Sequence, residues 1–186
     1  MIENFGEVVG KILALLDRRN HPKPEKILIL RNGVNRYHTQ DLQEKEISSL
    51  KQALKQEGIE HYAYVVPRKR NNLRLFQRQG KYMNNPEPGY LPFNNFLPSE
   101  EFLLQSQKLR YHMAKPSRYK FFLREGGVEL NLLADALFKL VYLYWKFKTP
   151  DQIPIPLQWA KKAATLVGEN QDQFEKVVFW EDLGFL

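Results

Sequence analysis

The sequence contains no cysteine among its 186 residues, and this absence excludes several kinds of chemistry. Without thiols the chain can form no disulfide, no cysteine nucleophile and no zinc–thiolate site, and it suits a reducing compartment. The sequence also lacks an apolar run of roughly 18 residues, the length that a membrane-spanning helix needs. Near the amino terminus, Glu3 and Glu7 stand where a secretory signal would carry basic residues. These absences predict a cytoplasmic protein with no membrane partner.

The composition is not biased enough for a disordered or fibrous chain. Hydrophobic residues make up 43% of the sequence and charged residues 26%, which is typical of globular proteins. The length suits one domain, for which roughly 150 residues is usual. No repeat or linker divides the sequence, so we expect residues 1–186 to form a single domain.

Acidic residues are missing from two long stretches of a chain that has a net charge of +7. The first stretch lies between Glu60 and Glu87 and the second between Glu101 and Glu125. The first contains Arg68, Lys69, Arg70, Arg74, Arg78 and Lys81, and the second contains Lys108, Arg110, Lys115, Arg118, Lys120 and Arg124. Such basic blocks favour a polyanionic partner, nucleic acid above all, although a solvated basic face with no partner is the alternative.

Apolar residues recur with a period of about 3.6 in four segments, which predicts four helices. These helices should cover residues 2–19, 41–57, 130–147 and 157–167. In the second helix, the apolar positions that should face inward are Leu42, Ile47, Leu50 and Leu54. The third helix is apolar nearly all round, which is typical of a buried helix.

Short apolar or alternating runs between these helices predict strands. The strands should cover residues 26–30, 61–66, 73–76, 102–104 and 119–123. The first is a continuous apolar run, typical of a strand buried on both faces. Residues 81–98 are rich in Pro, Gly and Asn, which predicts a long irregular loop. The alternation of strands and helices favours an α/β domain with a mixed sheet flanked by helices.

Four groups of segments resemble, in order and spacing, the C-terminal part of the PIWI domain of Argonaute proteins. They are PEKILILRNG, YVVPRKRNNLRLF, FLLQS with KPSRYKFFL, and LADALFKLVYLYWKF with IPIPLQWAKKAA. The resemblance covers roughly residues 24–168 and implies a portion of an RNase H-like fold. Active members of the family bind two divalent metals with four side chains, usually Asp, Glu, Asp and a final Asp or His, to cut a guide-paired strand.

The resemblance places poor metal ligands at both positions that can be aligned. Asn32 stands for the aspartate of the family's Arg-Asp-Gly motif, and Lys161 stands for the final His or Asp. A neutral amide is a weak ligand for Mg²⁺, and an ammonium group repels cations. The other two ligands should lie upstream of this sequence, and Glu44 and Glu46 should lie on the exposed side of a helix. We therefore expect no nuclease activity and no catalytic cofactor.

Basic and aromatic residues of the matched motifs are candidates for binding nucleic acid. Arg68, Lys69 and Arg70 follow a strand in a loop, where phosphate contacts are common, and a solubilising hairpin tip is the alternative. Arg74 should face the nucleic acid, whereas we interpret Phe76 as a core residue.

Further candidates follow from the last motif and the carboxyl terminus. Related proteins place a Tyr and an Arg on guide phosphates where Tyr144 and Lys146 end the long helix, although Tyr144 suits the core equally well. Lys161 and Lys162 should begin a helix, whose N-terminus attracts phosphate. The carboxylate of Leu186 is a candidate ligand for Mg²⁺ at the guide 5′ phosphate, and an aromatic tail that covers a hydrophobic face is the alternative.

Two functions fit these observations. The first is a nuclease-inactive PIWI module that binds guide or guide–target nucleic acid, single-stranded or paired. It could be one subunit of a split prokaryotic Argonaute, a kind of defence protein, with a second protein chain or self-association covering its open sheet edge. The second is a protein-interaction or structural remnant with no specific nucleic-acid role.

Overall fold

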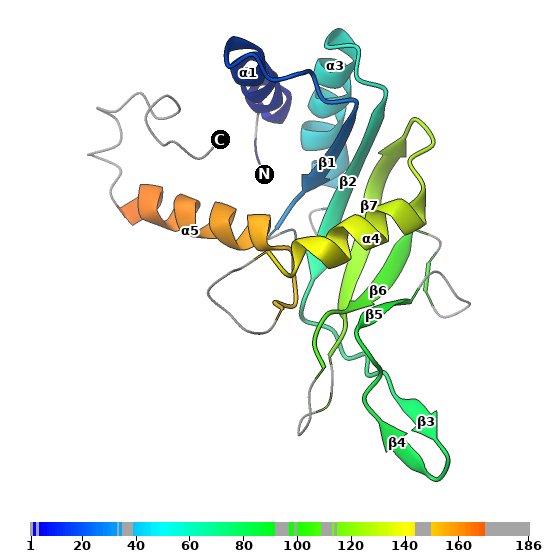
Figure 1. The fold of residues 1–186 in the computed structure, drawn as a ribbon. Helices are drawn as coiled ribbons and strands as arrows, with labels where there is room; N and C mark the ends of the chain where they lie inside the picture. Colours follow the sequence, from blue (N-terminus) through cyan, green and yellow to red (C-terminus); the bar gives the residue numbers. More distant parts are fainter. Residues whose placement is uncertain are drawn as a thin grey trace.

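The computed structural model describes residues 2, 4–32, 34, 39–91, 97–98, 100–108, 113, 115–143 and 150–169. In this part of the chain, a five-stranded sheet is covered by helices on both faces (Figure 1). Helices α1 (Phe5–Arg18) and α3 (Ser48–Gln56) cover one face, and α4 (Leu130–Leu140) covers the other. None of the described helices is long and apolar enough to cross a membrane.

The sheet is mixed, as the sequence predicts, with the strand order β1-β2-β7-β6-β5. β1 (Lys26–Leu30) pairs in parallel with β2 (His61–Arg68), and all other neighbours are antiparallel. The remaining strands are β7 (Ser117–Glu125), β6 (Glu101–Gln105) and β5 (Gly89–Leu91). The prediction that β1 is buried on both faces was wrong. Its apolar side chains are half-buried because β1 lies at one edge of the described sheet.

The first core lies between the sheet and the helices α1 and α3. The chain reaches this core a second time through one continuous helical segment. That segment comprises α2 (Thr39–Asp41), a π-helical stretch (Leu42–Ile47) and α3. The four side chains predicted to point inward are all buried there: Leu42, Ile47, Leu50 and Leu54. The first two are five positions apart, a spacing that a turn of π-helix brings to one face.

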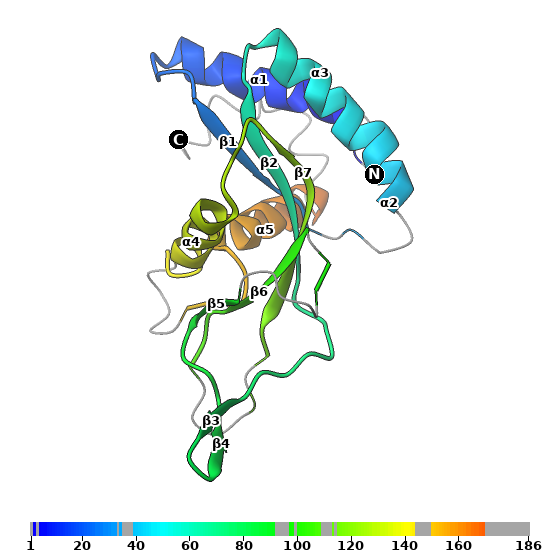
Figure 2. The ribbon, with the colours of Figure 1, turned by 90° about the vertical axis from the view of Figure 1, so that its right-hand side faces the viewer.

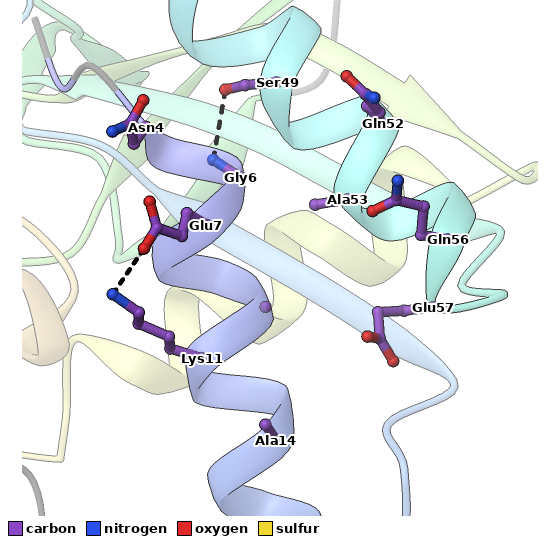
Figure 3. A pocket seen from close by; sticks show the side chains of 11 residues that line it. Asn4, Gly6, Glu7, Lys11, Ala14, Ser49, Gln52, Ala53, Gln56 and Glu57 are labelled. Carbon is purple, nitrogen blue, oxygen red and sulfur yellow. Dashed lines mark hydrogen bonds and ion pairs between the residues drawn. The ribbon is translucent and has the colours of Figure 1, made fainter.

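α1 and α3 approach so closely that α1 has room only for a glycine where they meet. A Cβ atom on Gly6 would lie 2.3 Å from the carbonyl oxygen of Ser49, whereas one on Gly10 would meet nothing within 4 Å. The Gly6 N–H also donates a hydrogen bond of 3.3 Å to the Ser49 hydroxyl (Figure 3). An open groove that includes Ala14 and Gln56 runs beside this contact.

We expect Gly6→Ala and Gly10→Ala to change the free energy of unfolding in opposite directions. Alanine at Gly6 collides with backbone atoms of α3, which cannot move aside as a side chain can, so the variant should lose about 1–3 kcal/mol. Alanine at Gly10 enters open space within a helix and should gain about 0.5–1 kcal/mol. Urea unfolding followed by circular dichroism measures both changes. Equal effects of the two substitutions would contradict the close approach at Gly6.

The second core lies between the sheet and α4. The stacked rings of Phe102 and Tyr119, with centroids 4.9 Å apart, pack there with buried residues of α4 such as Leu137. The predicted helix 130–147 is shorter than expected, because α4 ends at Leu140 and a turn follows. Its prediction as a helix buried all round was also wrong. Leu132 is exposed, since a helix on a sheet buries only the side that faces the strands.

The odd-numbered apolar residues of β7 are divided between the two cores because its pairing with β2 is interrupted once. Tyr64 pairs with Leu123, but the next residue, Val65, pairs with Phe121, so Phe122 is an extra residue in a β-bulge. Phe121 therefore belongs to the core under α4, whereas Leu123 belongs to the core under α1 and α3.

Two elements extend from this body, α5 (Ile155–Glu169) and the hairpin of β3 (Gln77–Gln79) and β4 (Tyr82–Asn84) (Figures 1 and 2). α5 confirms the helix predicted for residues 157–167. The strand predicted for residues 73–76 was wrong, since pairing begins only at Gln77. The irregular loop predicted for residues 81–98 was wrong in part, because β4 and β5 lie within it.

Candidate nucleic-acid interface

The two basic blocks of the sequence meet where β2 pairs with β7. The antiparallel register places Arg68 opposite Arg118 and Val66 opposite Lys120. Because residues directly opposite one another point to the same face of a sheet, these three cations share the face that α1 and α3 cover. The two helices lie over the other end of that face, as Figure 2 shows. Half-exposed cations from blocks about fifty residues apart thus form one surface.

The charges on this surface are only partly balanced. Arg68 and Arg118 are like charges placed directly opposite, which is destabilising by itself. The buried carboxylate of Glu101 forms an ion pair with Arg118 and offsets that repulsion. Lys120 lies 4.7 Å from the ring centre of Phe122, a cation–π contact. Arg68 and Lys120 form no ion pair with any residue that the structure describes, so both remain available to an anion.

The loop after β2 carries the other predicted phosphate ligands, and its members differ in their surroundings. Arg70 is exposed and forms no ion pair within the described residues. Lys69 forms an ion pair of 3.2 Å with Asp151, which precedes α5. The guanidinium of Arg74 donates to the carbonyl oxygens of Asn71 and Leu73, at 3.2 and 2.7 Å. These hydrogen bonds hold the backbone of the loop in its shape.

Phe76 is not a core residue, contrary to the prediction. Its side chain is 48% exposed, because residues 71–76 form a loop instead of a strand in the sheet. The Asn71 side chain donates to the carbonyl oxygen of Pro116 at 2.8 Å and accepts from the Leu73 N–H at 3.0 Å. These side-chain contacts with the backbone hold the loop beside β7 without strand pairing.

The two residues predicted to replace metal ligands belong to the carboxyl end of β1 and to α5, two elements that lie near each other. Asn32 follows the carboxyl end of β1, and Lys161 belongs to α5. Both ribbon views show the carboxyl end of β1 beside α5 (Figures 1 and 2), and the ion pair between Lys69 and Asp151 brings the start of α5 to the end of β2. An amide and an ammonium group do not fit a site for two divalent cations. Within the described residues, no three His, Asp or Glu side chains gather as metal ligands.

Lys161 and Lys162 do not begin a helix, so that part of the prediction was wrong. α5 begins at Ile155, six residues before Lys161, because the proline turn before it ends sooner than expected. The free N–H groups of the helix start are therefore not beside these lysines. Both side chains are exposed on the helix surface, so they can contribute charge without help from the N-terminus.

The prediction for Glu46 was wrong as well, whereas Glu44 is exposed as expected. Glu46 is fully buried and accepts two hydrogen bonds from the Arg31 guanidinium, at 3.0 and 3.1 Å. It also accepts one from the Tyr64 hydroxyl at 2.7 Å and one from the Ile2 N–H at 2.9 Å. All acceptor directions of the carboxylate are thus used within the protein, and Glu46 cannot serve as a metal ligand.

Glu46, Arg31, Tyr64 and the Ile2 N–H form a buried cluster, here called the Glu46 cluster. This cluster fixes the end of β1, directly before Asn32. Burial raises the pKa of Glu46, but hydrogen bonds from Arg31, the Ile2 N–H and Tyr64 lower it by more, so the group stays ionised. Burial and the neighbouring carboxylate raise the pKa of Tyr64, which therefore stays protonated and donates. Arg31 also donates to the carbonyl oxygen of Asn32 at 2.6 Å. The signal in the sequence was the spacing, since Glu46 lies four residues from both Leu42 and Leu50.

Three predicted site residues lie outside the described part of the chain: Tyr144, Lys146 and Leu186. The candidates named from the sequence do not include Arg118 and Lys120, although both belong to the second basic block. Their alternation with Tyr119 and Phe121 was the available signal, because alternate residues of a strand point to opposite faces.

Comparison with known proteins places this fold in a family. The Piwi domain model matches residues 1–172, and the chain belongs to the Piwi domain family. Piwi-like protein 1 of Danio rerio is 27% identical over 170 residues, which are 89% of this chain and 20% of that protein. The chain spans about a fifth of the length of the curated relatives that it matches. The family match includes α1 and extends beyond residues 24–168, which carry the resemblance seen in the sequence.

Two solved structures confirm the RNase H-like fold of the Argonaute PIWI lobe. Kluyveromyces polysporus Argonaute with a guide RNA has a TM-score of 0.72 and 20% identity, over 89% of this chain and 21% of that chain. Clostridium butyricum Argonaute bound to a guide DNA and a 19-mer target DNA has a TM-score of 0.69 and 18% identity, over 87% of this chain and 20% of that chain.

Proposed function

We propose that this chain is a nuclease-inactive Piwi module that binds guide or guide–target nucleic acid in the cytoplasm. The observation that carries the proposal is the meeting of both basic blocks on one surface, where Arg68, Arg70 and Lys120 form no ion pair with any described residue. Cations spread over strands and a loop match the spaced phosphates of a nucleic-acid backbone. The solved Argonautes with a similar fold hold guide RNA in one case and guide and target DNA in the other.

The inactivity is proposed from the chemistry of Asn32 and Lys161. Cleavage by two metals needs anionic or neutral ligands that hold both cations and activate water. The amide of Asn32 is a weak ligand for a hard cation, and the ammonium group of Lys161 repels one. The same ammonium group would instead attract a phosphate, so Lys161 is assigned to binding.

We expect the chain to cut neither guide-paired RNA nor guide-paired DNA in the presence of Mg²⁺ or Mn²⁺. Asn32→Asp alone and Asn32→Asp with Lys161→His should also remain inactive, because two ligands cannot assemble a site for two metals. End-labelled targets resolved on denaturing gels measure this. Cleavage at one defined bond that depends on metal and guide would contradict the proposal.

The binding function is tested by the affinity of the chain for single strands that differ only at the 5′ end. Fluorescence anisotropy with 5′-phosphorylated and 5′-hydroxyl strands at two salt concentrations separates recognition of the guide end from contacts along the backbone. Binding that is independent of sequence and falls steeply with salt supports the proposal. No binding to either strand at low salt would contradict it.

A role in protein contacts is the second candidate, and exposed apolar residues favour it. Trp159 of α5 and Leu132 of α4 are both about half exposed. In addition, β1 pairs only with β2 among the described strands, which leaves one edge to accept another strand. We propose that a second protein chain or a further copy covers this edge. Light scattering on the chain alone and beside a candidate partner tests that part of the proposal.

A further inference from the structure

The β3–β4 hairpin exposes large side chains that its own fold does not need. All six residues of the two strands are exposed, and Tyr82 and Met83 are 75% and 62% exposed. The strands join through Gly80, whose φ of +62° suits the tight turn, and Lys81. The hairpin extends away from the body in both ribbon views (Figures 1 and 2). A lone two-stranded hairpin is marginally stable, so its exposed aromatic and Met side chains gain little from folding.

The register gives the two faces of the hairpin different chemistry. Gln79 pairs with Tyr82 and Gln77 pairs with Asn84, so one face carries an aromatic ring among three amides. The Asn84 amide donates to the Gln79 side chain at 2.8 Å, which orders that face beside the ring. Arg78 pairs with Met83 on the other face.

The charge of the hairpin is entirely positive. Its cations are Arg78 and Lys81, and no acidic residue occurs between Glu60 and Glu87. Within the described residues neither cation forms an ion pair, and the Arg78 Nε donates only to the carbonyl oxygen of Gly80, at 3.1 Å. Exposed aromatic rings beside unpaired cations are the combination that binds single strands, because a ring stacks on a base while a cation contacts phosphate.

We infer that the β3–β4 hairpin is an arm that binds a single-stranded segment of nucleic acid. Tyr82 stacks on an unpaired base, Gln79 and Asn84 contact the edge of that base, and Lys81, in the turn beside Tyr82, contacts a flanking phosphate. The inference rests on the proposed function and extends it beyond the surface on β2 and β7. The positive charge favours a nucleic acid over an apolar protein partner, and stacking favours a single strand, since the base faces of a duplex are already covered.

The test compares Tyr82→Ala, Tyr82→Phe and Lys81→Ala in the 186-residue chain. Leu132→Ala serves as a control, because Leu132 is an exposed apolar residue on α4. Anisotropy is measured with a labelled single strand and with a blunt duplex of the same length, at several salt concentrations. All these side chains are exposed, so circular dichroism should show an unchanged fold.

We expect Tyr82→Ala to weaken binding of the single strand about five- to one-hundred-fold, the effect of losing one stacked base. Tyr82→Phe keeps the ring and should bind nearly as well as the unmodified chain, as should Leu132→Ala. Neither Tyr82 variant should change binding of the blunt duplex. Lys81→Ala should flatten the log–log salt slope for the single strand by about 0.7, whereas Tyr82→Ala should leave the slope unchanged.

The outcomes distinguish a failure of the inferred arm from a failure of the proposed function. If the unmodified chain binds no probe, the proposed function and the arm both fail. If the chain binds but Tyr82→Ala binds equally well, the arm is wrong and the proposed function stands, as would happen if the hairpin contacts a protein. If Tyr82→Ala weakens single strand and duplex alike, stacking on an unpaired base is wrong.

Discussion

Replacing Glu46 by alanine should lower the free energy of unfolding by about 3–5 kcal/mol, the usual cost of removing one partner from a buried ion pair. The Arg31 guanidinium would lose both of its hydrogen bonds to the carboxylate and remain partly buried without a counter-charge. The Tyr64 hydroxyl, buried beside it, would lose its acceptor. Denaturant unfolding followed by circular dichroism measures the loss.

Two further variants serve as comparisons for the loss of stability in Glu46→Ala. Glu44→Ala removes an exposed carboxylate from the same helical segment and should change stability by less than about 0.5 kcal/mol. Tyr64→Phe removes one hydrogen bond to the charged carboxylate and should cost about 1.5–3 kcal/mol. If Glu46→Ala were as stable as Glu44→Ala, the buried cluster would not form in solution.

The contribution of Glu46 should also depend on pH in a defined direction. Its pKa in the folded chain lies below its ordinary value, so the carboxylate stabilises the fold at any pH above that ordinary value. This contribution is lost as the pH falls from the ordinary pKa of a glutamate through the lower pKa of the folded chain. The difference in stability between the unmodified chain and Glu46→Ala should therefore shrink on acidification.

Neutralising three cations of the candidate interface should remove most of its salt-dependent binding. The triple variant Arg68→Gln, Arg70→Gln, Lys120→Gln changes the cations that form no ion pair with any described residue. If each contacts one phosphate, the log–log salt slope for a single strand should flatten by about 2, at roughly 0.7 for each contact. Lys69→Ala should have a smaller effect on affinity than Arg70→Ala, because Lys69 already interacts with Asp151.

The matched control is Arg18→Gln, Lys26→Gln, Lys55→Gln. These exposed cations lie at the end of α1, the start of β1 and the end of α3, at the opposite end of the parallel strands. Both triple variants lose the same charge, so an effect of net charge alone would weaken binding equally. Equal salt slopes for the two triple variants would mean that the surface on β2 and β7 is not the binding site.

The fold could be predicted from the sequence in those segments whose apolar residues recur with one clear period, either that of a helix or that of a strand. The strands at 61–66, 102–104 and 119–123 and the helices at 2–19 and 157–167 all form, because their apolar residues must face one core or the other. The hairpin was missed because its six exposed residues carry no apolar pattern, and only the turn at Gly80 and the pairing of backbone groups define it.

The candidate site was predictable in its charge but not in its geometry. Composition locates the basic blocks, yet only the register shows that Arg68 faces Arg118, and only the fold shows that Asp151 reaches Lys69. Glu46 was misplaced because a charged residue was assumed to face solvent, although its spacing placed it in line with buried leucines. Long-range partners of this kind are absent from any local pattern.

The extra residue in β7 has a consequence for how this chain tolerates changes in length. The bulge at Phe122 reverses the alternation of the strand, so the cations at 118 and 120 face one side while Arg124 faces the other, where it donates to Val128. Deletion of Phe122 would remove only the extra residue, so the residues on either side of it would pair with β2 in one continuous alternation and keep their present faces. The cations at 118 and 120 would stay on the face that α1 and α3 cover, and Leu123 would stay in the core under those helices. The bulge is therefore a point in β7 where the chain can lose one residue while the basic surface and both cores keep their side chains.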